Sequence, residues 1–109
     1  MTNAGTGPTD TVVVPLAGEL DIAVAEDVRL RGLAALEQPG VRTVVLDLTE
    51  VTFLDSSAIG ALVEIRNAAN PAGVPVTLRN ASSSIRRTVE IMGLTDLFVL
   101  DPDSAPPVG

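Results

Sequence analysis

One segment near the middle of the chain constrains the fold more than any other. Residues 41–48 read VRTVVLDL, an aliphatic run that lacks the alternation of apolar and polar residues expected of a half-exposed strand. Such a run is typical of a strand covered on both faces, as in parallel sheets flanked by helices. The segment therefore predicts a strand inside a helix-covered sheet.

The rest of the chain alternates between strand and helix patterns. Further strands are predicted at residues 11–17, 74–79 and 97–100, and helices at residues 24–36, from 55–57 to about 69, and after the cap-forming residues 80–84. This order predicts an α/β fold, with helices packed against a mostly parallel or mixed sheet of about four to five strands. Pro15 lacks the donor that a central strand needs, which places the first strand at an edge.

The domain limits follow from the ends of the chain. Residues 1–10 are predicted to be a flexible N-terminal arm, and residues 101–109 a flexible, acidic, proline-rich tail. The folded domain then spans residues 11–100. Within it, residues 49–54 are expected to form a connector in which Val51 and Phe53 are apolar anchors.

The expected buried faces of the three helices follow from helical spacing. The first helix should bury Val24, Val28, Gly32, Ala35 and Leu36. The second should bury Ile59, Leu62 and Val63, with Arg66 near the rim, and the third Ile85, Val89 and Met92. Gly93 is expected to terminate the third helix.

Composition removes most catalytic chemistry. The chain has no cysteine, histidine or lysine, and therefore no thiolate nucleophile, no imidazole base and no amine for a Schiff base. An enzyme is not expected, and neither is a bound metal or other cofactor. Asp21, Asp47 and Asp55 lie at or near predicted strand ends, where oxygen ligands could hold Mg²⁺. We interpret them as capping and turn residues.

Charge and hydropathy restrict the partners. Fourteen acidic residues against seven arginines give a formal net charge of −7, which argues against nucleic acid and anionic membranes as partners. No apolar run approaches the roughly 20 residues of a membrane span. The N-terminus lacks the pattern of a secretion signal. A cytoplasmic protein is the expectation.

The tripeptide Asp55-Ser56-Ser57 is a strong helix-start pattern, because short side-chain oxygens accept hydrogen bonds from free backbone amides. Local chemistry leaves two interpretations open. Both serines could simply cap the helix, or one could be a hydroxyl that another protein phosphorylates. A helix N-terminus tolerates phosphate well. The added charge of about −1.5 to −2 would act on a docked partner.

The string of residues 47–60, DLTEVTFLDSSAIG, resembles the signature of bacterial anti-sigma factor antagonists of the STAS domain family. The similarity extends over about residues 11–100 through three further elements, which are GELD at 18–21, VPVTL at 74–78, and MGL at 92–94 with Phe98. Ala58 departs from the glycine common at its position. The first ten residues look too polar for the extra edge strand common in the family.

The resemblance implies a partner-switching regulator of transcription, a monomer when free. Its unphosphorylated form would bind a serine-kinase anti-sigma factor and free the sigma factor. The kinase would then phosphorylate Ser56, with Ser57 as second choice, and a serine/threonine phosphatase would restore the protein. The implied partner-binding residues are Asp21, Asp55, Ser56, Ser57 and Ile59. The alternative is a STAS-like structural or ligand-linked module of a signalling or transport assembly, with Ser56 as a plain cap.

Overall fold

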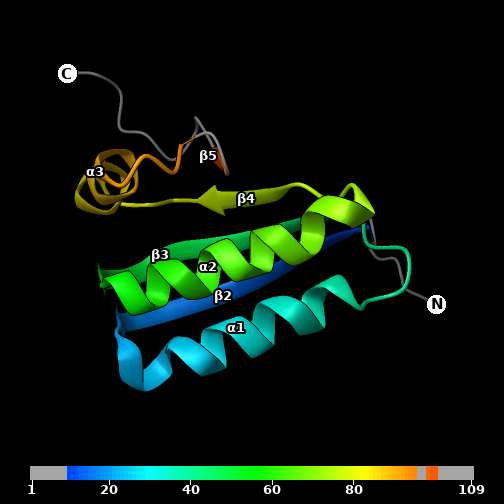
Figure 1. Ribbon diagram of the computed structural model, residues 1–109, viewed down its shortest axis with the longest axis horizontal. Helices are drawn as coiled ribbons and strands as arrows, with labels where there is room; N and C mark the ends of the chain where they lie inside the picture. The colour runs from blue at the N-terminus through cyan, green and yellow to red at the C-terminus, as the bar shows by residue number, and fades with distance from the viewer. Residues whose placement is uncertain (1–9, 96–97, 101–109) are drawn as a thin grey trace.

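The computed structural model describes residues 10–95 and 98–100 (Figure 1). Their elements are β2 (Thr11–Leu20), α1 (Ile22–Leu36), β3 (Thr43–Leu54), α2 (Ser56–Ala69), the 3-10 turn η1 (Asn70–Ala72), β4 (Val76–Arg79), α3 (Ser83–Ile91) and β5 (Val99–Leu100). The predicted alternation of strands and helices, and with it the α/β class, is confirmed.

The described strands form one sheet in the order β2-β3-β4-β5, and every neighbouring pair is parallel. β2 lies at one edge of this sheet, as Pro15 predicts. β5 contributes only two residues. The sheet thus has three parallel strands of four or more residues and a two-residue addition, compared with the expected sheet of about four to five strands. Residues 1–9 of the predicted arm and residues 101–109 of the predicted tail lie outside the described residues. The segment in which an extra N-terminal strand would lie is therefore also outside them.

The aliphatic run that predicted a covered strand lies in β3, and Val44, Leu46 and Leu48 have no exposed surface. Figure 1 shows α1 and α2 side by side across the sheet, with α3 beyond β4. The predicted face of α1 is confirmed. Its buried members are Val28, Gly32 and Ala35, with Val24 and Leu36 half-buried against the core.

β3 is longer than predicted, because residues 49–54 belong to the strand and do not form a connector. β2 continues beside them to Leu20, through register shifts between Pro15 and Ala17 and between Gly18 and Glu19. An extra residue in one strand of a pair breaks the two-residue alternation, which disguises the strand in the sequence. As a result Val51 is buried, as expected of an anchor, but Phe53 is exposed.

Two predicted helix faces need correction. In α2 the residues that face the core include three alanines as well as Ile59, Leu62 and Ile65, while Val63 and Arg66 are only half-buried at its flank. Alanines are buried there because the helix lies close to its neighbours. In α3, Ile85 and Val89 are buried but Met92 is exposed.

The end of α3 explains why Met92 is exposed. Met92 is the C-cap, and Gly93 follows with a left-handed φ of 71°, as its role of terminator requires. The amide of Leu94 then donates to the carbonyl of Val89 at 3.0 Å. The chain reversal therefore turns Leu94, and not Met92, back against the core.

Candidate functional site

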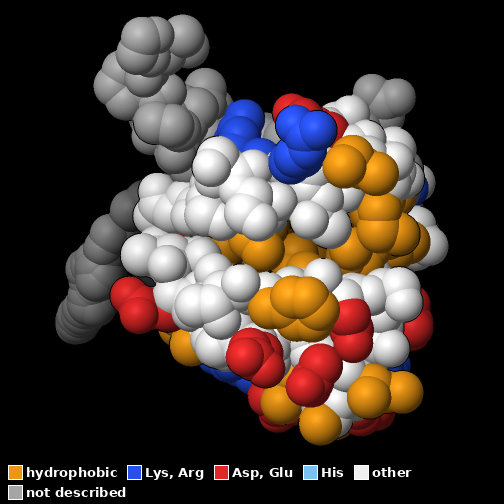
Figure 2. All heavy atoms as spheres, turned by 90° about the vertical axis from the view of Figure 1, so that its left-hand side faces the viewer, with side chains coloured by type: hydrophobic (Ala, Val, Ile, Leu, Met, Phe, Trp, Pro, Cys, Tyr) orange, Lys and Arg blue, Asp and Glu red, His pale blue; other side chains and the backbone are white. Residues whose placement is uncertain are grey.

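The carboxyl ends of β2 and β3 meet at one end of the sheet, where α1 and α2 begin. Leu20 pairs with Leu54 in the parallel register, and the amide of Asp55 donates to the carbonyl of Leu20 at 3.1 Å. Both strands therefore pass into helices side by side. This end lies on the left of Figure 1 and faces the viewer in Figure 2. Sites commonly collect at such strand ends in parallel sheets.

An aspartate caps each of these two helices. The carboxylate of Asp21 accepts from the amide of Ala23 at 3.0 Å, and Oδ1 of Asp55 accepts from the amide of Ala58 at 3.0 Å. The helix start predicted at residues 55–57 is confirmed, with Asp55 as the cap and Ser56 as the first helical residue. Each carboxylate satisfies an amide that the helix leaves free at its start.

Ser56 is exposed at the surface, whereas its neighbour Ser57 is half-buried. Within the part of the chain that the structure describes, no hydrogen bond engages the Ser56 hydroxyl. The helix start consequently depends on Asp55 and not on this hydroxyl. Chemistry at Ser56 Oγ can proceed without breaking a hydrogen bond of the described fold.

Ile59 is buried, as its helical spacing predicts, although the resemblance implies a partner-binding role for it. Only 4% of it is exposed, and it lies in the hydrophobic core beneath α2. It supports the helix from below and offers a partner almost no area. Of the five predicted partner-binding residues, the structure brings Asp21, Asp55, Ser56 and Ser57 together at one end of the sheet and places Ile59 inside.

Two apolar side chains at this end were not predicted as surface residues. Ile22 is the first residue of α1 and is 76% exposed, and Phe53 near the end of β3 is 49% exposed. A repeated pattern in the sequence could have located Ile22 but not Phe53. Each strand ends at a leucine that an aspartate follows, at 20–21 and at 54–55, so Ile22 and Ser56 hold equivalent positions at their helix starts.

Acidic residues surround this surface. Glu19 and Glu50 are exposed, and Asp21 and Asp55 are half-buried. Figure 2 shows acidic and hydrophobic side chains next to one another over the lower half of this face, while arginine side chains gather near its top. The neighbourhood of Ser56 is therefore both acidic and partly apolar.

Asp47 lies inside β3 and not at its end as expected, and it stabilises this part of the sheet. Its carboxylate accepts from the hydroxyl and the amide of Thr49, and these hydrogen bonds, with a smaller effect from the charge of Arg79, lower the pKa of Asp47. Nδ2 of Asn80 donates to the hydroxyl of Thr49 at 2.9 Å. Asn80 has a left-handed φ of 60°, a conformation that asparagine tolerates well. The network links β3 to the connection between β4 and α3.

The three aspartates thus have local structural roles, as interpreted from the sequence. Among residues 10–95 and 98–100, no three acidic side chains cluster closely enough to hold a metal ion. In the same part of the chain, no helix is long and apolar enough to cross a membrane.

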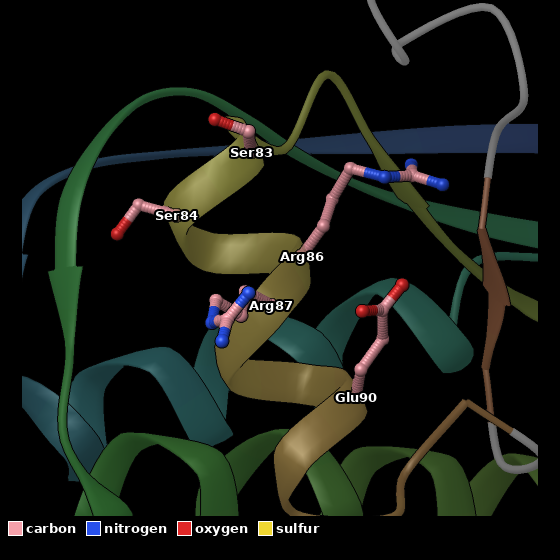
Figure 3. A pocket seen from close by; sticks show the side chains of 5 residues that line it. All are labelled: Ser83, Ser84, Arg86, Arg87 and Glu90. Atoms are coloured by element: carbon pink, nitrogen blue, oxygen red, sulfur yellow. The ribbon is translucent and has the colours of Figure 1, made fainter.

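The start of α3 presents a different surface. Ser82 caps this helix, and its hydroxyl accepts from the amide of Ile85 at 3.2 Å, which confirms the capping interpretation of that serine. An open hollow of about 510 Å³ beside it is lined by Ser83, Ser84, Arg86, Arg87 and Glu90. Figure 3 shows Arg86 and Glu90 extending from one side of the helix and Ser84 and Arg87 from the other. Every lining side chain is polar.

Comparisons with known proteins agree with this architecture. The model of the STAS domain family matches residues 5–105. The anti-sigma F factor antagonist of Lysinibacillus sphaericus is 35% identical over 86 residues, which cover 78% of this chain and 73% of that protein.

Two solved structures share the fold. SpoIIAA, a Bacillus cell fate determinant solved in its phosphorylated form, is 28% identical with a TM-score of 0.62, and the match covers 90% of this chain and 88% of that one. The STAS domain of a SulP transporter from Vibrio cholerae is 23% identical with a TM-score of 0.71, over 94% of this chain and 81% of that one. The chain belongs to the STAS domain family and is a relative of the bacterial anti-sigma factor antagonists.

Proposed function

We propose that this protein is an anti-sigma factor antagonist that is switched by phosphorylation of Ser56. The unphosphorylated form binds a serine-kinase anti-sigma factor and so frees the sigma factor. The kinase transfers phosphate from ATP to Ser56, and the phosphorylated protein then dissociates from the kinase. A serine/threonine phosphatase removes the phosphate and restores the binding form. The observation that carries the proposal is the exposure of Ser56 at the first position of α2, beside a cap that does not use its hydroxyl.

The electrostatics of the helix start explain how one phosphate can act as a switch. Free amides and the positive end of the helix dipole accommodate the group, so the fold is retained. The phosphate brings about −1.5 to −2 charges next to Asp55. A partner that closes over the helix start must bury this charge out of water, which costs several kcal/mol where no counter-charge is positioned for it. A loss of about 2.7 kcal/mol in docking corresponds to a hundredfold weaker complex.

The composition supports the role of substrate and binding partner. Without histidine, cysteine or lysine, the chain lacks the usual groups that activate a hydroxyl, so the kinase must supply them. Asp21 and Asp55 hold the two helix starts in place beside Ser56, and they contribute to the acidic surface that the partner meets. Ser57 is the second candidate for modification and is less exposed.

The test combines each purified serine-kinase anti-sigma factor of the source organism with this protein and ATP. We expect one phosphate, located at Ser56 by mass spectrometry of peptides. Ser56→Ala should abolish the modification and retain binding, whereas the neighbouring Ser57→Ala should be phosphorylated like the wild type. Undiminished phosphorylation of Ser56→Ala would show that the modified residue lies elsewhere.

A second candidate function is that of a STAS module in a transport assembly. The similarity to a transporter STAS domain favours it, although at 23% identity this likeness shows the fold alone. In that case Ser56 is a structural residue of the helix start. Ser56→Asp would then leave every partner interaction intact, and no anti-sigma factor would bind the unmodified chain.

A further inference from the structure

Six large hydrophobic residues are exposed in the described part of the chain, and two of them lie at the end of the sheet that carries Ser56. These two, Ile22 and Phe53, are called here the apolar pair. Exposing a large side chain removes the stabilisation that its burial would give, about 1.5–3 kcal/mol for a full isoleucine or phenylalanine. A side chain left exposed beside a docking site is available for burial by a partner.

The strand register fixes where the apolar pair lies relative to Ser56. Phe53 pairs with Glu19 and Leu54 with Leu20, so the two helix starts follow from adjacent strands. Strands lie about 4.8 Å apart and packed helices about 8–10 Å apart. Ile22 and Ser56 therefore lie at neighbouring helix starts, with Phe53 on the strand just before Ser56. A partner of ordinary size, covering about 800 Å² of each molecule, would cover all three.

Charge indicates what kind of partner fits. Glu19 and Asp21 flank the pair on the β2 side, and Glu50 and Asp55 lie on the β3 side. The hydrophobic and acidic side chains adjoin on the face shown in Figure 2. An apolar centre within a charged surround is the usual arrangement of a specific interface. The matching surface is an apolar recess bordered by lysine or arginine side chains.

We propose that Ile22 and Phe53 are the apolar anchors of the surface that docks the anti-sigma factor, and that this partner receives them in a recess with a basic border. The inference rests on the proposed function and adds the residues that supply affinity. The division of roles is then clear: the apolar pair provides buried area, and the charge at Ser56 decides whether the two surfaces can close.

The experiment measures the dissociation constant of the purified serine-kinase anti-sigma factor by isothermal titration calorimetry. Phe53→Ala and Ile22→Ala should each weaken binding about tenfold or more, as central anchors do. Ile91→Ala is the matched control for Ile22→Ala, because Ile91 is 72% exposed but lies on α3, beyond β4. Leu30→Ala, on α1 about 12 Å along the helix from Ile22, is the second control. Both controls should stay within twofold of the wild type.

The outcomes separate this inference from the proposed function. If the wild type binds and Ser56 phosphorylation abolishes binding, but the apolar-pair variants behave like Ile91→Ala, the anchors are wrong and the switch stands. Equal losses in all four variants would also overturn the anchors. If the unmodified wild type binds no anti-sigma factor, both proposals are wrong. Thermal melting should show that all four variants remain folded, since every substituted side chain is exposed.

Discussion

The starts of α2 and α3 share their local chemistry but lie in different surroundings. In each, an extended residue accepts a hydrogen bond from the amide three positions later, Asp55 from Ala58 and Ser82 from Ile85, and serines follow. The start of α2 is surrounded by carboxylates and the apolar pair, whereas arginines line the hollow beside α3. The comparison teaches that a capping pattern determines where a helix begins. The charged and apolar residues around that start determine how a modified hydroxyl there would affect binding.

The consequence is electrostatic. A negative charge added at Ser56 joins Asp55 and the other acidic residues, and a partner that fits closely over the apolar pair must then bury and desolvate that charge. The same charge at Ser83 lies in a hollow lined by Arg86 and Arg87, which compensate it. We therefore expect one added charge to change docking strongly at the first position and weakly at the second.

The largest expected effect tests how α2 is held. Gly32 of α1 packs so closely on α2 that a Cβ there would overlap the side chain of Ile65, which is fully buried. Gly32→Val should lower the free energy of unfolding by about 3 kcal/mol through overpacking. Gly60→Val is the matched control on the open face of α2, where an added Cβ meets nothing within 4 Å, and it should change stability by less than about 0.5 kcal/mol. Urea denaturation measures both.

If Gly32→Val and Gly60→Val were equally stable, α1 would not constrain α2, and the start of α2 would be held no more firmly than the start of α3. Hydrogen exchange in the Gly32→Val protein compares the two helices directly. We expect amides of α2 to lose more protection than those of α3, because α3 packs on β3 and not on α1.

The second prediction compares one added charge at the two helix starts. Ser56→Asp carries about half the charge of a phosphate and should weaken anti-sigma factor binding about tenfold, which is ~1.4 kcal/mol. Ser83→Asp should leave the affinity within twofold. Titration calorimetry measures both constants. Equal effects at the two serines would contradict the importance of the surroundings.

The third prediction concerns the feature that the two starts share. Asp55→Ala and Ser82→Ala each remove a capping hydrogen bond and should each lower stability by about 1 kcal/mol. Asp55→Asn retains a capping side chain and should lose about half as much or less, through the weaker interaction with the helix dipole. Thermal unfolding checks the series. If only one of the two alanine substitutions lowered the melting temperature, the two capping hydrogen bonds would not be equivalent.

The smallest effect comes from the network between the two regions. Hydrogen bonds from Thr49 lower the pKa of Asp47 in the folded protein, so its stabilising contribution is present above the ordinary value of 3.8 and is lost as pH falls through the lower folded pKa. Asp47→Asn should therefore cost up to about 1 kcal/mol at pH 7, and the difference from the wild type should shrink below pH 4. Urea denaturation at pH 7, 4 and 3 measures how this difference in the free energy of unfolding changes with pH. A difference independent of pH would exclude the charge as its source.

Most of the fold could be predicted from the sequence because its signals are local and strong. The aliphatic run of β3, the cap at Asp55 and the glycine at position 93 each act through their own backbone, and the structure has all three where they were expected. The extension of β3 through residues 49–54 could not be predicted, because register shifts against β2 remove the alternation that identifies a strand.

The surface around Ser56 was harder to predict for the same reason. Phe53 was expected to be an anchor inside the fold, and the bulged strand leaves it exposed. Helical spacing correctly predicted that Ile59 is buried, whereas its inclusion among the partner-binding residues came from the resemblance. The choice of Ser56 over Ser57 came from the resemblance, because local chemistry alone does not separate two serines that follow one aspartate.

The most direct measurement compares the two states of Ser56 in one binding experiment. The protein is phosphorylated by the purified anti-sigma factor kinase, separated from the unmodified form, and both forms are titrated into the kinase bound to ADP. We expect the unmodified form to bind and the phosphorylated form to bind at least about a hundredfold more weakly, with the same melting temperature within a few degrees. Equal affinity of the two forms would contradict the switch, and so would a loss of binding that accompanies unfolding of the phosphorylated protein.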